Sequence, residues 1–221
     1  NYLVADAANA HVVHFLALGG TDLENAKVKE WNTPTATGNS GITGVGFQPD
    51  CVLHMYAAGG AAYETVSGNS RFTLGAMESG GRQWVNAINS VNAANPSDAQ
   101  RFQKTNQTLL APTNALGTEF EASYVSMDAD GFTLNFTTVA GSAHKCWSLC
   151  LKGGRYYAGS FNAPTGGAPQ DTVVSAPGFA PVGYLLSSFC RDASAAAANN
   201  SRQAVGASDG TLEQCAVWLD D

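Results

Sequence analysis

The stretch Gly41-Ile-Thr-Gly-Val-Gly-Phe-Gln-Pro-Asp-Cys-Val-Leu-His-Met55 decides the fold of this chain of 221 residues. Its centre, Gly46-Phe-Gln-Pro49, places a glycine, an aromatic residue and a proline directly before an apolar run. Glycine allows unusual backbone angles, and proline fixes φ and lacks an N–H donor, so the motif predicts a tight turn that enters a buried strand. We therefore expect residues 52–56 to form a central strand of a sheet.

A second copy of this motif, Gly178-Phe-Ala-Pro181, stands 132 residues further along the chain (178 − 46). The residues that both copies keep are folding residues, namely Gly46, Phe47, Pro49, Gly178, Phe179 and Pro181. Three further matches follow the same order: His11…Phe15-Leu-Ala-Leu18 with His144…Ser148-Leu-Cys-Leu151 (144 − 11 = 133), Trp31-Asn-Thr-Pro-Thr35 with Phe161-Asn-Ala-Pro-Thr165 (161 − 31 = 130), and Leu74-Gly-Ala76 with Val205-Gly-Ala207 (206 − 75 = 131), after which Gln83 falls on Gln214. These ordered matches predict an internal duplication with a period of about 131 residues, which is the size of a complete β-sandwich.

The duplication predicts how the chain is divided into units. Residues 21–153 should form a complete β-sandwich unit of jelly-roll-like type, and residues 154–221 a second, incomplete unit. Residues 1–20 match the terminal strands of a unit. We therefore expect them to complete the sheet begun by residues 154–221, in the same chain or in a neighbouring one.

The pattern of apolar residues predicts an all-β fold. Strands are expected at residues 2–5, 11–18, 27–31, 52–56, 72–77 and 83–88, and Asp128-Ala-Asp-Gly131 predicts a hairpin turn between strands 120–127 and 132–136. Residues 93–107 are polar and indicate either a surface loop or the start of a helix. No long amphipathic helix is evident, so the expected fold class is all-β with tandem β-sandwich units.

The composition argues against two classes of partner. The net charge is −7 and the 11 lysine and arginine residues do not cluster, whereas a phosphate backbone requires a basic surface. No apolar run approaches the roughly 20 residues of a membrane span. Charged residues make up only 13%, which suits a surface that neighbouring subunits cover. We expect neither a nucleic-acid nor a membrane partner.

The cysteines indicate reduced thiols. There are five of them, at positions 51, 146, 150, 190 and 215, and an odd number without regular spacing does not form a disulfide framework. A disulfide that holds the fold should also occur in both copies. Instead, Gly183 occupies the position of Cys51, and Trp84 is expected at the position of Cys215.

Four strings in the chain resemble a family of structural proteins from tailed bacteriophages. They are Phe15-Leu-Ala-Leu-Gly-Gly20, Thr33-Pro-Thr-Ala-Thr-Gly38, Ile42-Thr-Gly-Val-Gly-Phe-Gln-Pro-Asp50 and Asp128-Ala-Asp-Gly-Phe-Thr-Leu-Asn-Phe136. The resemblance covers most of the chain through both copies. It implies a β-sandwich component of the virion, such as a capsid decoration, head fibre or tail-associated protein, assembled in the host cytoplasm and then extracellular. The implied partners are other virion proteins and further copies of the chain.

The resemblance supplies no catalytic residues, and we expect neither an enzyme nor a cofactor. In the second copy Ala180 and Val182 replace Gln48 and Asp50, so any contact made by Gln48 or Asp50 exists only once. The candidate acids, which are Glu64, Glu78, Glu119 and Glu121, stand in no recognisable catalytic motif.

Metal binding is the weaker interpretation of the histidines. His11 and His14 are three residues apart, which places their side chains on opposite faces of a strand. His54 and His144 complete no known ligand spacing. Asp128-Ala-Asp-Gly131 could begin a calcium loop, but no acidic residue follows near the twelfth position. We expect a hairpin there and no metal site.

Aromatic residues leave a second function open, a carbohydrate-binding adhesion module at a tail or fibre tip that recognises a glycan of the host surface. The residues that could stack on sugars are Trp31, Tyr56, Tyr63, Trp84, Tyr156, Tyr157 and Trp218. Trp31 and its counterpart Phe161 are expected in the core, because both copies keep an aromatic residue there. Tyr63 stands in a loop without an aromatic counterpart, so it is the better candidate for ligand binding. Trp84 is the second candidate.

Overall fold

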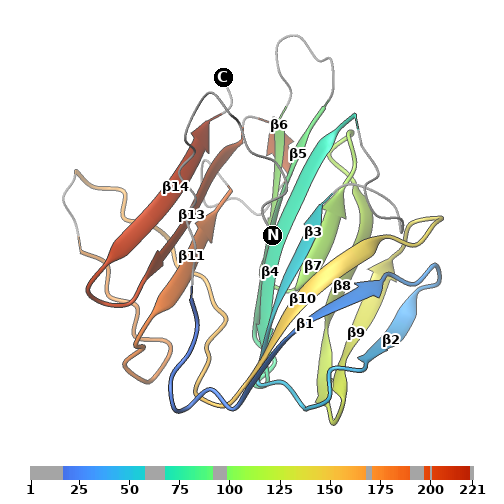
Figure 1. The fold of residues 1–221 in the computed structure, drawn as a ribbon. Helices are drawn as coiled ribbons and strands as arrows, with labels where there is room; N and C mark the ends of the chain where they lie inside the picture. Colours follow the sequence, from blue (N-terminus) through green and yellow to red (C-terminus); the bar gives the residue numbers. More distant parts are fainter. Residues whose placement is uncertain are drawn as a thin grey trace, which may run out of the picture.

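All regular elements in the described part of the chain are β-strands. The computed structural model describes residues 17–57, 68–91, 99–167, 171–189, 197–199 and 201–219. Their strands form three antiparallel sheets (Figure 1), which confirms the all-β class. Within these ranges no helix is long and apolar enough to cross a membrane.

The largest sheet has seven strands in the order β1-β10-β3-β4-β5-β6-β12. Their bounds are β1 (Asn25–Asn32), β3 (Cys51–Ala57), β4 (Ser70–Glu78), β5 (Gln83–Ser90), β6 (Ala99–Lys104), β10 (Lys145–Lys152) and β12 (Ala198–Asn199). As predicted, β3 is a central strand, between β10 and β4. The prediction of a loop or helix at residues 93–107 was wrong for β6. A hydrophobicity pattern does not reveal this strand, because it buries the polar side chain of Gln100. The amide oxygen of Gln100 accepts a hydrogen bond from Asn89.

The second sheet has four strands in the order β2-β9-β8-β7. Their bounds are β2 (Gly38–Thr43), β7 (Leu109–Pro112), β8 (Thr118–Asp128) and β9 (Gly131–Thr138). The predicted hairpin joins β8 to β9, with Asp128 opposite Gly131. Gly131 has a φ of 147°, and a Cβ there would lie 1.9 Å from the carbonyl oxygen of Ile42 on β2. Glycine is therefore required where the hairpin passes β2.

The two sheets pack face to face around a large apolar cluster, and Val85, Ala87, Phe102 and Leu110 form a smaller one. The buried residues of the large cluster come from both layers: Trp31, Val52, Tyr56, Met77, Cys146 and Cys150 from the large sheet, and Ile42, Leu109, Ala111, Phe120, Ala122, Met127, Phe132, Leu134 and Phe136 from the small one. The layers approach closely at Gly75 on β4, where a Cβ would lie 1.9 Å from the carbonyl oxygen of Thr108. Residues 25–152 thus form a two-layer β-sandwich.

A third sheet, β11-β13-β14, stands on the opposite side of the large sheet, across from β4 and β5 (Figure 1). Its strands are β11 (Tyr184–Ser188), β13 (Arg202–Ser208) and β14 (Glu213–Leu219). Asn86 Nδ2 on β5 donates to the backbone oxygen (3.3 Å) and to Oγ (2.9 Å) of Ser187. The rings of Phe72 and Phe189 lie 6.1 Å apart. Ser187 therefore faces the sandwich, and its neighbours in β11 face away from it.

The three strands of this sheet have the order and register of β3-β4-β5. Gly75 lies opposite His54 and Val85, and Gly206 lies opposite Leu186 and Cys215. The offsets are 132 (186 − 54), 131 (206 − 75) and 130 (215 − 85). In this register Cys215 aligns with Val85, one residue away from the match with Trp84 that the sequence offsets predict. The cause is a shorter turn, because the paired residues before β14 are 5 apart (213 − 208) and those before β5 are 6 apart (83 − 77).

The segments that the expected duplication matches to β1 and β2 contain no strand. They are residues 155–162 and, within the described range, 171–175. Phe161 is 48% exposed, whereas Trp31 is 8% exposed, so the prediction that both belong to the core was wrong for Phe161. The reason is that Trp31 is covered by Phe132 and Phe136 of β9, at ring distances of 6.2 and 6.4 Å. No described strand covers Phe161 in the same way.

Candidate functional site

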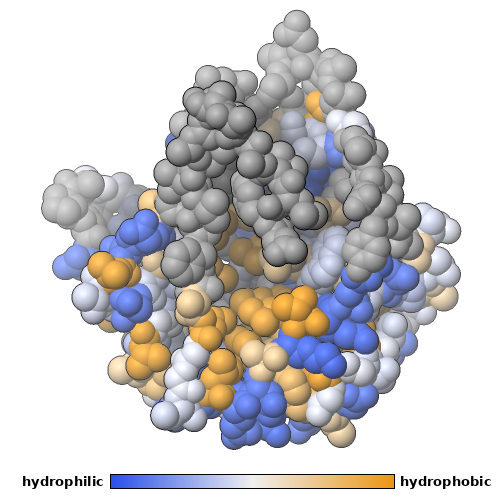
Figure 2. Space-filling view, viewed as in Figure 1, coloured by the Kyte–Doolittle hydropathy of each residue, from blue (hydrophilic) through white to orange (hydrophobic). Residues whose placement is uncertain are grey.

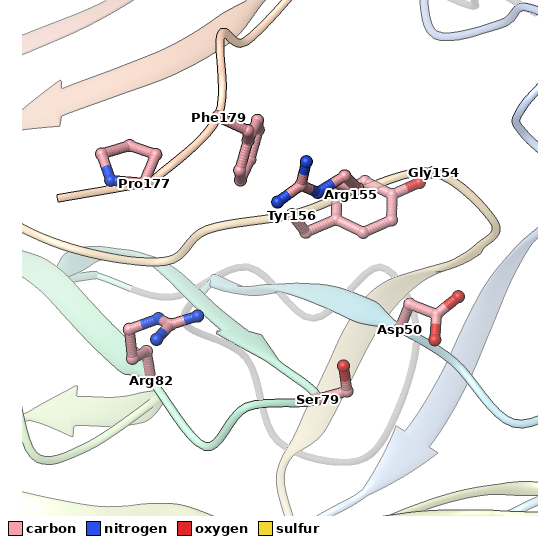
Figure 3. A pocket seen from close by; sticks show the side chains of 8 residues that line it. All are labelled: Asp50, Ser79, Arg82, Gly154, Arg155, Tyr156, Pro177 and Phe179. Carbon is pink, nitrogen blue, oxygen red and sulfur yellow. The ribbon is translucent and has the colours of Figure 1, made fainter. Parts of the chain in front are cut away.

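A cavity of about 320 Å³ lies where the sandwich meets the chain that leads to β11 (Figure 3). Its lining consists of Asp50, Ser79, Arg82, Gly154, Arg155, Tyr156, Pro177 and Phe179. Both copies of the Gly-Phe-x-Pro motif contribute, because Asp50 follows the first and Phe179 belongs to the second. Gly46 and Gly178 have φ values of 90° and 67°, as tight turns before the strands require.

Asp50 is fixed at the sandwich side of the cavity by three hydrogen bonds. Its N–H donates to the carbonyl oxygen of Leu151 (2.8 Å), and its own carbonyl oxygen accepts the N–H of Ser79 (2.9 Å). Its carboxylate accepts the N–H of Gly153 (2.8 Å). Asp50 therefore ties the entry of β3 to the end of β10. Its counterpart Val182 is 92% exposed and cannot accept such a bond.

Two guanidinium groups border the cavity and each lies on an aromatic ring. Arg82 lies over the ring of Tyr157 at 4.5 Å and forms an ion pair with buried Glu78 at 2.9 Å. Arg155 lies over the ring of Phe179 at 4.7 Å. Such cation–π contacts stabilise the junction and leave guanidinium N–H groups able to donate. The Arg155–Phe179 contact also joins the sandwich to the second motif.

The cavity is suited to binding a polar group. Burial raises the pKa of the Tyr156 phenol, so its hydroxyl stays protonated and can donate a hydrogen bond. Arg155 can bind a carboxylate, and the ring of Phe179 offers an apolar surface. Among the described residues that line the cavity, Asp50 is the only one with a carboxylate, whereas glycoside hydrolysis uses a pair of them.

The titratable groups with the largest pKa shifts lie in the core. Trp31 Nε1 donates to Ser148 Oγ (2.8 Å), and His54 Nδ1 lies 2.8 Å from the same oxygen. Burial lowers the pKa of His54 to about 3, so it is neutral at ordinary pH. Burial, assisted by the charge of Glu119, raises the pKa of Tyr56 to about 12. These groups are packing residues and do not line the cavity.

Most of the residues considered as site candidates from the sequence cannot be placed against the cavity. His11, His14, Tyr63 and Glu64 lie outside the described residues. Trp84 is half-buried on β5 and is not part of the cavity lining.

The acids considered as catalytic candidates are held in separate ion pairs. Glu119 pairs with Arg71, and Glu121 pairs with Lys104. In the described ranges no group of three or more metal-ligating side chains occurs.

The aspartates of the hairpin have donors within the protein. Asp130 accepts the N–H groups of Gly44 (2.9 Å) and Gly46 (2.5 Å), which lowers the pKa of its carboxyl. Asp128 accepts the hydroxyls of Ser126 and Thr133. The exposed residue Gln48 donates from Nε2 to the carbonyl oxygen of Met127 (2.7 Å). These contacts hold the turn at Gly46-Phe-Gln-Pro49 against the β8–β9 hairpin.

The cavity residues were missed by sequence reasoning, apart from Asp50, Tyr156 and Phe179. Arg155 follows the glycine pair that ends the sandwich, and that position was the one available signal. The four described thiols, Cys51, Cys146, Cys150 and Cys215, are free, as predicted; Cys190 lies outside the described residues.

Comparison of the chain with protein-family models, with curated proteins and with solved structures finds no match. The resemblance to phage structural proteins therefore depends on the quoted motifs alone. The function has to be argued from the surface, the cavity and the core.

Proposed function

We propose that the protein is a non-enzymatic structural component of a tailed-bacteriophage virion, as a capsid decoration, head fibre or tail-associated protein. It acts through contacts with other virion proteins and with further copies of itself. The sequence motifs support the virion role. One surface, the outward face of the third sheet, carries the argument for protein–protein contacts.

We call this surface the open face. It consists of Tyr184, Leu186, Ser188, Ala204, Gly206, Ser208, Glu213, Cys215 and Val217, which alternate along β11, β13 and β14 and lie opposite one another. Leu186 is 44% exposed and Val217 is 61% exposed. Their counterparts in the sandwich, His54 and Ala87, are both 0% exposed. The same surface is thus covered by a second layer in the sandwich and uncovered in the third sheet.

Gly206 also distinguishes the open face from the covered face of the sandwich. Its counterpart Gly75 has to be a glycine, because a Cβ there would lie 1.9 Å from the carbonyl oxygen of Thr108. At Gly206 the nearest atoms are 3.2 Å away and belong to Gln214 and Cys215 of the adjacent strand. Among the described residues no second layer packs on Gly206. A glycine at this position suits a partner whose backbone packs closely on the open face.

A second apolar surface lies on the outer face of the large sheet. Figure 2 shows apolar residues gathered in the region where β1, β10 and β3 run in Figure 1. Val28 on β1 and Met55 on β3 are 64% and 41% exposed there. Contiguous apolar surface of this kind marks protein–protein contact sites more often than isolated exposed residues do.

The location of the strongly shifted pKa values in the core also favours a structural role over a catalytic one.

Sedimentation velocity of the purified chain over a range of concentrations tests the assembly role. The wild type should self-associate, and Leu186→Lys combined with Val217→Lys should shift it to monomer. Val125→Lys on β8, 39% exposed on another surface, is the matched control and should associate like the wild type. A wild-type chain that remains monomeric at all concentrations contradicts self-association through the open face.

The cavity favours one alternative, a glycan-binding module for an acidic saccharide. Arg155 would bind the carboxylate, and Phe179 with Tyr156 would contact the sugar ring. A glycan array followed by titration calorimetry tests this function. Saturable binding that is lost in Arg155→Ala supports it at the cavity, whereas loss only in Tyr63→Ala places the ligand at the loop expected from the sequence. No saturable binding contradicts the alternative.

A further inference from the structure

Two charged residues lie at opposite ends of the open face. Glu213 begins β14, and Arg202 begins the antiparallel strand β13, two residues before Ala204 and therefore on the same outward side of the sheet. Both residues are exposed. In the part of the chain that the structure describes, neither forms an ion pair. Their charges are therefore available to a partner.

These two charges are too far apart to neutralise each other within one chain. Glu213 lies opposite Ser208, which is six residues from Arg202 along β13 (208 − 202). At about 3.4 Å per residue, the negative and the positive end are separated by about 20 Å along the strands. The surface between them carries no charged residue, because the remaining members of the open face are apolar, small or hydroxyl side chains. The open face is thus an uncharged patch with one acidic and one basic end.

Two copies of such a face can pack on each other with two-fold symmetry in two ways. If β13 of the two copies runs in the same direction, each Arg202 end meets the Arg202 end of the second copy, and like charges face each other. If β13 of the two copies runs in opposite directions, each Glu213 end meets an Arg202 end. Like charges that face each other across an interface weaken binding, so charge selects the second arrangement.

The side chains can reach each other in this arrangement. Packed sheets lie about 10 Å apart, and neighbouring strands within a sheet lie about 4.8 Å apart. Glu213 on β14 would face Arg202 of the second copy on the adjacent strand, with the two backbones about 11 Å apart. Glutamate and arginine have long side chains that together span such a distance. Two symmetric ion pairs would therefore form, one at each end of the interface.

The middle of the open face also fits this arrangement. The midpoint between the charged ends lies level with Ser187, Val205 and Ala216, which are opposite one another. Gly206 therefore faces Ala204 of the second copy across the two-fold axis. Neither residue has a side chain larger than a methyl group, so the two sheets can approach closely at their centre.

The large side chains of the open face meet small ones. Leu186 and Ser188 stand on either side of the midpoint on β11, and Cys215 and Val217 do so on β14. Leu186 would therefore face Ser188 of the second copy, and Val217 would face Cys215. Leu186 and Val217 are 44% and 61% exposed, and this packing would cover both.

We propose that the open face binds the open face of a second copy in a two-fold dimer, in which β13 of the two copies runs in opposite directions and Glu213 of each copy pairs with Arg202 of the other. This dimer rests on the self-association proposed above and specifies its partner surface and its symmetry. Because a two-fold contact closes on itself, it gives dimers and no filament.

Sedimentation velocity of charge-reversed full chains at low salt tests the pairing. Arg202→Glu and Glu213→Arg each create two like-charge contacts in the dimer, and each should raise its dissociation constant at least about tenfold. The double variant exchanges the two charges and should dimerise within about threefold of the wild type. An equimolar mixture of the two single variants should form a mixed dimer of similar stability, because every glutamate then faces an arginine.

Net charge provides the matched control. Glu213→Arg changes the net charge from −7 to −5 (−7 + 2), and weaker overall repulsion alone would strengthen association. Glu24→Arg makes the same change outside the open face, at a side chain that is 61% exposed, and should dimerise at least as tightly as the wild type. Weakening by Glu213→Arg but not by Glu24→Arg therefore identifies a local charge contact.

The outcomes separate the geometry of the dimer from self-association itself. A wild type that associates while the single reversals are neutral, or while the double variant stays as weak as they are, overturns the end-to-end pairing and leaves self-association intact. A wild type that is monomeric at all concentrations overturns both. Weakened single variants that recover in the double variant and in the mixture support the dimer.

Discussion

Replacement of His54 by leucine should remove a defined part of the acid sensitivity of the protein. His54 is fully buried, and burial lowers its pKa in the folded state from 6.5 to about 3. Between these values the unfolded chain binds a proton that the folded chain does not. The contribution of His54 is therefore unchanged above pH 6.5 and becomes destabilising as the pH falls below it.

The magnitude follows from the linkage between proton binding and folding. Each pH unit below 6.5 costs about 1.4 kcal/mol, so lowering the pH from 7 to 5 costs about 2 kcal/mol through His54. In His54→Leu, the side chain of counterpart Leu186, this cost disappears, while Ser148 still accepts the N–H of Trp31.

Urea unfolding at pH 7, 6 and 5 measures the effect, because all other titrating groups are shared by the two proteins. The wild type should lose about 2 kcal/mol more of its free energy of unfolding than His54→Leu over this range. If the two proteins lose stability in parallel, the claim that burial keeps His54 neutral in the folded protein is refuted.

Three further predictions concern contacts in the sandwich. Gly75→Ala should cost at least about 3 kcal/mol by steric overlap with the facing layer, whereas Gly206→Ala should cost about 1 kcal/mol or less; equal losses in urea unfolding would contradict the open face. Asp50→Ala should cost about 1–2 kcal/mol through the lost carboxylate acceptor, while Val182→Ala stays within about 0.5 kcal/mol; a neutral Asp50→Ala would refute its role at β3. Iodoacetamide should label Cys215 in the native protein and spare the three buried core thiols, whose pKa is raised by burial; labelling of all four at similar rates would disprove their burial.

The strands that could be predicted from the sequence are those with a clear apolar pattern. The motif before residues 52–56 gave the central strand, and the turn at Asp128 gave the β8–β9 hairpin. Strands β2, β6, β7 and the two-residue β12 were missed. β2 is rich in glycine and serine, β7 is only four residues long, and β6 buries the polar side chains Gln100 and Arg101 at 3% and 5% exposure.

The error at Phe161 and the missed cavity have a common cause. Burial depends on a second layer, and the sequence of residues 155–162 does not reveal whether that layer is in place. The cavity likewise depends on a tertiary junction, since Arg82, Arg155 and Phe179 come from three separate segments. Local pattern identifies such residues as loop residues and gives no information on their neighbours.

The location of the protein in a phage culture tests the proposed function most directly. Particles from the source culture can be banded on a density gradient, probed by mass spectrometry and labelled with gold-tagged antibody against this chain in the electron microscope. A virion structural component should co-band with intact particles and label one site on the head or tail at a constant number of copies. A chain that stays in the particle-free fractions and labels no particle would contradict the proposal.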